Sequence, residues 1–142
     1  MSKDLTKADL TLQEFIPKLK TWYEGKFPER TLEVFSVDRI PPEQLLLFCK
    51  GRVSSEVGAA LIQAGFIDQN NTKVTDKDGY NTKSRHNDIP SEAVDVVIKI
   101  AGNYVWADSY YQPFGQIIFE MGYSGEIRWG GSWGDFGHIE CR

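Results

Sequence analysis

The chain has 142 residues, of which 41% are hydrophobic and 25% charged. This composition excludes disordered and fibrous proteins, and the length fits one domain spanning residues 1–142. The net charge of -4 comes without a basic block, so we expect no nucleic-acid partner, because phosphate neutralisation needs clustered Lys and Arg. No segment approaches the roughly 18 apolar residues of a membrane span, and we expect no membrane insertion.

The first third of the chain predicts a helix, a strand and one ambiguous segment. Apolar residues at spacings of three and four from Leu12 to Tyr23 predict a helix, which Pro17 either kinks or starts afresh. The alternating segment Thr31–Val37 predicts a short strand. After Pro41-Pro42, the apolar run Leu45–Phe48 fits a strand or a buried helix, and its periodicity favours neither.

The middle of the chain predicts a helix followed by a long loop. Ser54 or Ser55 is the predicted N-cap, and Gly65 is the predicted end of the helix. The apolar stripe of this helix consists of Val57, Leu61 and Ile62. The polar segment Asp68–Ser84 is too long for an ordinary connection, and such loops are usually functional or disordered.

The last third predicts mainly strands. Ala93–Ile100 is predicted to be a buried strand with Asp95 near its start, and Pro113–Met121 a helix. Ile127–Trp129 and His138–Glu140 are predicted as short strands. Helices and mainly antiparallel strands in this order predict a small α+β domain with a central antiparallel sheet and flanking helices.

The cysteines and the N-terminus bear on the compartment. Two cysteines, Cys49 and Cys141, cannot form a disulfide framework, and we interpret both as thiols. Residues Met1–Leu10 are polar and lack the apolar segment of a secretory signal, so we expect synthesis in the cytoplasm without Sec-type export.

The only two histidines lie in settings that suggest metal binding. His86 precedes Asp95, whose buried carboxylate needs a partner or a cation, and His138 follows Asp135 by three residues. Two imidazoles and one carboxylate are the three ligands of a catalytic zinc site whose fourth position is open. Asp135 is then placed to act as the general base. The alternative is two ordinary histidines and an aspartate that caps a turn or pairs with arginine.

These segments resemble a known family. The shared motifs are Ser84-x-His86, Ala93-Val94-Asp95, Trp129-Gly130-Gly131-Ser132-Trp133 and Asp135-x-x-His138-x-Glu140. They resemble the zinc D-Ala-D-Ala carboxypeptidases and L-alanyl-D-glutamate endopeptidases, a group that includes phage endolysins. The resemblance covers about residues 45–140 and leaves 1–40 outside, and it implies a fold related to the hedgehog signalling domain.

The resemblance implies a role for each matching residue. It makes His86, Asp95 and His138 the zinc ligands and Asp135 the general base and acid. Ser84 would contact substrate. Arg52, which follows Gly51 and precedes a capped helix, is matched to an arginine that stabilises the oxyanion or binds a substrate carboxylate.

Several assignments remain open at this point. The stretch between His86 and Asp95 is longer than the common family pattern, so Asp88 competes with Asp95 as a ligand. Glu140 either holds a histidine in its tautomer or is simply solvated. The aromatic residues Trp129, Trp133, Tyr110 and Tyr111 either line a groove or pack in the core.

From the resemblance we expect a monomeric zinc metallopeptidase that cuts the peptide stem of bacterial peptidoglycan. The favoured activity is that of an L-alanyl-D-glutamate endopeptidase acting as a phage endolysin, held in the host cytoplasm until lysis and then acting in the cell wall. One alternative is a D-Ala-D-Ala carboxypeptidase or dipeptidase on the same scaffold. Another is a noncatalytic zinc-containing virion or binding module.

Overall fold

A computed structural model describes residues 2–68 and 70–142. The strands are β1 (Arg30–Ser36), β2 (Ala93–Ile100), β3 (Asn103–Val105), β4 (Ile127–Trp129) and β5 (His138–Cys141). The helices are α1 (Leu10–Lys26), α2 (Pro41–Cys49), α3 (Ser55–Gln63) and α4 (Pro113–Glu120). Short 3-10 turns, η1 to η4, cover Leu5–Lys7, Arg85–Asn87, Asp108–Tyr110 and Gly130–Trp133. The predicted α+β class is confirmed.

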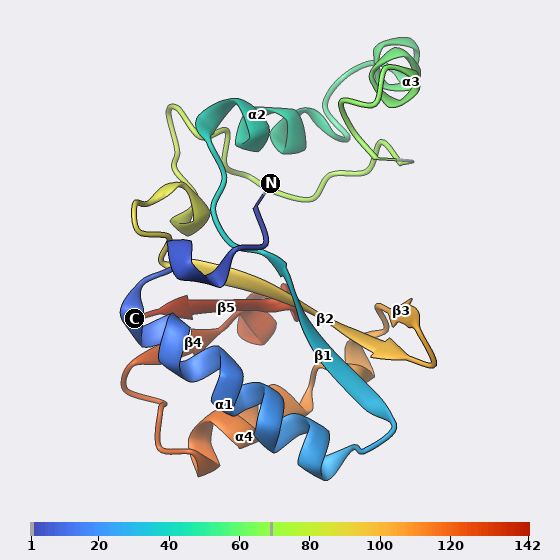
Figure 1. Ribbon diagram of the computed structural model, residues 1–142. Coiled ribbons are helices and arrows are strands. Elements are labelled where there is room, and N and C mark those ends of the chain that lie inside the picture. Colours follow the sequence, from blue (N-terminus) through green and yellow to red (C-terminus); the bar gives the residue numbers. More distant parts are fainter. Residues whose placement is uncertain (1, 69) are drawn as a thin grey trace.

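The sheet is antiparallel and has β2 at its centre. The strand order is β1-β2-β5-β4, and β3 pairs with β2. Helices α1 and α4 lie against one side of the sheet, whereas α2 and α3 stand on the other side, where the long loop returns to the sheet (Figure 1). The sheet therefore has one face packed against helices and one face turned toward the α2–α3 region.

The hydrophobic core lies between the sheet and the α1–α4 layer. Val94, Val96 and Ile98 of β2 point into it, because alternate residues of a strand face opposite sides. Buried side chains from both helices complete it, among them Leu12, Phe15, Leu19, Phe114 and Ile117. Asp95, between two core residues of β2, is thereby directed to the opposite face.

Two ambiguities in the first half of the chain are resolved. Helix α1 runs through Pro17 as one helix. The segment Leu45–Phe48 belongs to helix α2, which begins with Pro41 at a position where the missing N–H costs nothing. The Glu43 carboxylate accepts a hydrogen bond from the Ile40 N–H at 3.1 Å and so closes the first turn.

The middle region matches its prediction only in part. Ser54 caps α3, and its Oγ accepts from the Val57 N–H at 3.2 Å. The apolar stripe of α3 is not buried, since Val57 is 48% exposed and Leu61 and Ile62 are half-buried. Helix α3 stands away from the sheet (Figure 1). The described residues of the predicted loop 68–84 contain no helix or strand, and residue 69 lies outside the described residues.

Two further predictions concern the cysteines and the membrane. Cys49 and Cys141 are both free thiols, as predicted. Among the residues that the structure describes, no helix combines the length and the apolar character needed to cross a bilayer.

Candidate metal centre

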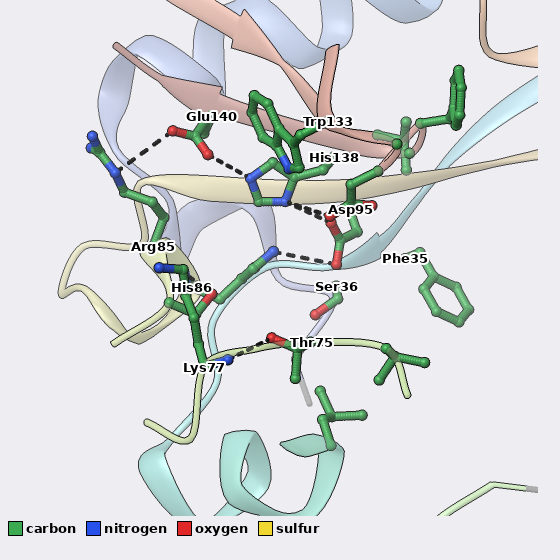
Figure 2. A pocket seen from close by; sticks show the side chains of 18 of the residues that line it. Phe35, Ser36, Thr75, Lys77, Arg85, His86, Asp95, Trp133, His138 and Glu140 are labelled. Atoms are coloured by element: carbon green, nitrogen blue, oxygen red, sulfur yellow. Dashed lines mark hydrogen bonds and ion pairs between the residues drawn. The ribbon is translucent and has the colours of Figure 1, made fainter. Parts of the chain in front are cut away.

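His86, Asp95 and His138 come together on the face of the sheet that α1 and α4 leave uncovered. They arise from η2, β2 and β5, and the backbone pairs Asp95 directly opposite His138. One ligand atom from each side chain lies within 4.8 Å of the other two. Figure 2 shows both imidazole rings directed at the Asp95 carboxylate. The three residues predicted as zinc ligands thus form one cluster.

The orientation of His86 leaves one ring nitrogen for a ligand. Its Nδ1 lies 2.6 Å from the Val37 carbonyl oxygen, which can only accept, so Nδ1 carries the proton. The buried Nε2 lies 3.3 Å from Asp95 Oδ2 but has no hydrogen-bonding partner among the described residues. A neutral imidazole would therefore direct a lone pair at a carboxylate, an unfavourable arrangement unless a cation or a proton lies between them.

The other histidine is oriented in the complementary way. His138 Nε2 lies 2.8 Å from Glu140 Oε1, while Nδ1 lies 3.2 Å from Asp95 Oδ1. Arg128 holds Glu140 in place with a hydrogen bond of 2.6 Å to Oε2. Glu140 is buried and pairs with His138, so of its two open interpretations the structure supports the one in which it fixes the ring.

The electrostatics of the cluster favour a cation at its centre. Burial alone would raise the pKa of Asp95, but the imidazoles of His86 and His138 and the Arg39 guanidinium hold this pKa well below its usual range. Burial opposes the charge on His138, but Asp95 and Glu140 outweigh it and raise the pKa of His138 to about 9. A proton on His138 Nδ1 would lie between the ring and Asp95 Oδ1, which is 3.2 Å away. These residues fit a divalent cation that would displace that proton.

Asp135 is placed beside this cluster by a loop that needs glycine. Asp135 N–H bonds to Gly130 O at 2.9 Å, and a Cβ at Gly130 would lie 2.3 Å from Asp135 O and 2.9 Å from the His138 Cβ. Asp135 Oδ2 lies 3.7 Å from His138 Nδ1, and its side chain is 57% exposed. Partial burial, and then the charge of Asp95, raise the pKa of Asp135. The group is therefore near the cluster, open to solvent and more basic than an ordinary aspartate.

Two other predicted residues, Ser84 and Arg52, have partners outside the three-residue cluster or only along their own turn. Ser84 lies in the wall of the site cavity, where its Oγ caps η2 and accepts from the His86 N–H at 3.2 Å. Arg52 donates to Phe48 O at 2.7 Å and to Asp76 at 3.1 Å, and it stacks on the Phe48 ring. Arg52 is not among the described residues that line the cavity. The substrate contact of Ser84 and the anion-binding role of Arg52 stay predictions.

Arg39 is the site residue that the sequence interpretation missed. Its Nη2 lies 2.6 Å from Asp95 Oδ2, and its Nη1 donates to the buried Gln44 at 3.2 Å. Its backbone N–H also donates to the His86 carbonyl at 2.9 Å. Asp95 is 56 positions away in sequence. The one signal in the sequence was that a buried aspartate needs a positively charged partner, and this signal does not say which arginine supplies it.

A cavity of about 960 Å³ opens over the cluster. Trp133 lies in its wall, edge-on to His138 at 5.8 Å between ring centroids. Trp129 packs against the core instead, with its indole N–H bonded to Phe136 O at 2.7 Å. Asp88 is not part of the three-residue cluster found among the described residues. The cavity is large enough for a peptide-sized ligand next to the cluster.

Comparison with known proteins adds one structural similarity. No model of a known protein family matches the chain, and no curated protein matches its sequence. The crystal structure of Serratia marcescens L-Ala D-Glu endopeptidase ChiX matches with 21% identity and a TM-score of 0.44, over 79% of this chain and 67% of that chain. A similarity of this size indicates no activity by itself, and a function has to be inferred from the site.

Proposed function

We propose that the protein is a zinc metallopeptidase that hydrolyses an amide bond in the peptide stem of bacterial peptidoglycan. The observation that carries this proposal is the convergence of two imidazoles and a carboxylate within 4.8 Å, with the outward nitrogen of each ring held by Val37 or Glu140. Three protein ligands with a remaining open side are typical of catalytic zinc, whereas structural zinc sites have four.

The neighbouring residues supply the rest of the chemistry. Zinc bound here would lower the pKa of water to roughly 7 and polarise the substrate carbonyl. Asp135, within 3.7 Å of His138, takes the proton from the attacking water and delivers it to the leaving amine. Its raised pKa suits it to both transfers. The two imidazoles and then Arg39 keep Asp95 ionised, and Arg39 also orients it through a contact of 2.6 Å. We therefore assign Arg39, rather than Arg52, as the arginine of this site.

The substrate class rests on the resemblance of the motifs around Ser84, Asp95 and Asp135 to the peptidoglycan peptidases. Within that class we favour L-alanyl-D-glutamate endopeptidase activity, with the protein acting as a phage endolysin. It would be held in the host cytoplasm and reach the wall at lysis. A D-Ala-D-Ala carboxypeptidase would use the same residues on a different bond.

The test is digestion of purified sacculi by the zinc-loaded protein, followed by mass spectrometry of the products. An L-alanyl-D-glutamate cut exposes a new D-Glu amine, whereas a carboxypeptidase releases free D-Ala. Asp135→Ala serves as the matched control, because an acid at this position is needed only for turnover. Intact sacculi after incubation with zinc-loaded wild type would contradict the proposal and favour a noncatalytic module.

A further inference from the structure

Three aromatic side chains form an unexplained group beside the metal centre. Phe35 of β1, Tyr104 of β3 and Trp106 just after β3 make edge-to-face contacts, with ring centroids 5.2 to 6.1 Å apart. Tyr104 is 43% exposed and Trp106 is 55% exposed. Large aromatic rings that contact one another yet remain open to solvent indicate a binding surface more than a core. We call this group the aromatic platform.

The backbone places the aromatic platform on the same face of the sheet as the cluster. Val34 pairs with Val96 and Ser36 pairs with Asp95, so Phe35 is the extra residue of a β-bulge next to Asp95. Bulges of this kind redirect side chains and are frequent beside active sites. Tyr104 pairs with Lys99, which lies two positions from Val97 on the Asp95 face of β2.

The aromatic platform is continuous with the cavity over the cluster. Phe35 and Trp106 line this cavity together with Asp95 and His138. Figure 2 shows the Phe35 ring on the side of Asp95 that faces away from Glu140 and Arg85. A ligand that reaches the cluster from this side would therefore contact the Phe35 and Trp106 rings.

The surroundings of the rings suit an uncharged, amphipathic ligand. Lys3 Nζ lies over one face of the Phe35 ring, 5.3 Å from its centroid, and Lys99 Nζ lies over one face of the Tyr104 ring at 5.4 Å. Glu33 pairs with Lys99 at 3.4 Å, so the polar rim carries both signs of charge. A pyranose has a C–H face that stacks on aromatic rings and hydroxyl or acetamido groups that hydrogen-bond at its edge. Such a ligand matches both the rings and the rim.

We propose that the aromatic platform binds the N-acetylated sugar to which the peptide stem is attached. This proposal rests on the proposed function. In that substrate the sugar joins the stem through L-alanine, so the L-alanyl-D-glutamyl bond lies about one residue, roughly 3.5 Å of chain, from the sugar linkage. A D-Ala-D-Ala bond lies about four residues away, roughly 14 Å. Phe35 is adjacent to Ser36, which pairs with Asp95, so a sugar on the platform would favour cleavage of the first bond.

The test compares a free stem peptide with the same peptide on its N-acetylglucosaminyl-N-acetylmuramyl disaccharide. For the zinc-loaded wild type we expect a KM about tenfold lower on the glycopeptide. Trp106→Ala should remove this advantage by raising the KM for the glycopeptide by about tenfold more than the KM for the free peptide. The matched control is Trp22→Ala, which truncates an exposed tryptophan on helix α1. It should leave KM and kcat unchanged on both substrates. Equal effects of Trp106→Ala on the two substrates, or none, would overturn the proposal.

A second measurement keeps the test independent of hydrolysis. The peptide-free disaccharide is titrated into wild type to about 10 mM, and the Trp106 indole and Tyr104 amide signals are followed by NMR. Saturable shifts of both signals in wild type, with the Tyr104 amide shift lost in Trp106→Ala, support the proposal even if neither peptide is cleaved and the proposed function fails. If neither signal shifts, the proposal is overturned. Shifts that change with protein concentration instead of disaccharide concentration would assign the platform to contact between copies of the chain, and would also overturn it.

Discussion

Strand β2 faces two different environments along the same eight residues. Val94, Val96 and Ile98 enter a core in which burial is the only requirement, and neighbouring helices supply apolar partners. Asp95, on the other face, is held by Arg39, His86 and His138, each at a specific atom. The core face should therefore determine stability and tolerate similar side chains. The cluster face should determine chemistry and tolerate very little.

The largest effect is expected on activity, at Asp135. Asp135→Ala removes the proposed proton acceptor without removing a metal ligand, so hydrolysis of sacculi should fall by about 100- to 10,000-fold. Zinc content and thermal unfolding should stay close to wild type, because the side chain is largely exposed. Turbidity assays on purified walls measure the loss. Undiminished activity would exclude Asp135 as the general base.

A core-face substitution should act on stability alone. Ile98→Ala removes a fully buried side chain of β2 and should lower the free energy of unfolding by about 2–5 kcal/mol. The folded fraction should still bind one zinc, since Ile98 points away from the cluster. Urea unfolding and metal analysis of the same sample measure both quantities. A loss of zinc from folded Ile98→Ala would show that the two faces are coupled.

Glu140, which lies against His138 Nε2, should affect the affinity for zinc. Glu140→Ala removes the acceptor that fixes the Nε2 proton, and zinc affinity should fall by about 10- to 100-fold. Glu140→Gln, which keeps an acceptor oxygen, should lose less. Glu29→Gln removes an exposed carboxylate just before β1 and should leave the zinc affinity unchanged. Competition with a zinc-binding dye measures all three, and an unaffected Glu140→Ala would contradict the positioning role.

The smallest expected effect is the release of one proton when zinc binds. With the pKa of His138 raised from 6.5 to about 9, the metal-free protein holds this ring charged at pH 7.5. Zinc binding at that pH should release about one proton, detectable by calorimetry in buffers of different ionisation enthalpy. The raised pKa also stabilises the metal-free fold below pH 6.5, and this contribution is lost as the pH rises through 9. The melting temperature of the metal-free protein should therefore fall over that interval, and a rise would contradict the assignment.

Sequence patterns predicted the elements whose shape follows from local burial. The apolar run Ala93–Ile100 coincides with β2, and Ile127–Trp129 coincides with β4. Strand β3 was missed because none of its three residues is fully buried, whereas the equally short β4 begins with the buried Ile127. The Leu45–Phe48 run was ambiguous because the residues that start helix α2, Pro41 and Glu43, lie before the run.

The cluster was predictable in part, for a different reason. His86, Asp95, Asp135 and His138 carry their chemistry in their residue types and spacing, and the structure brings them together. Arg39 was not found because its contact with Asp95 depends on β1 and β2 pairing with a bulge near Ser36. Arg52 had a suggestive sequence context, but it contacts Phe48 one turn earlier and Asp76 in the long loop instead of the cluster.

The central claim is that His86, Asp95 and His138 hold one zinc ion. The most direct measurement is elemental analysis of the purified protein after zinc reconstitution and dialysis, with His86→Ala beside it. We predict one zinc per wild-type chain and none in the variant, with both proteins folded by circular dichroism. A folded wild type that retains no zinc would contradict the claim and, with it, the proposed peptidase activity.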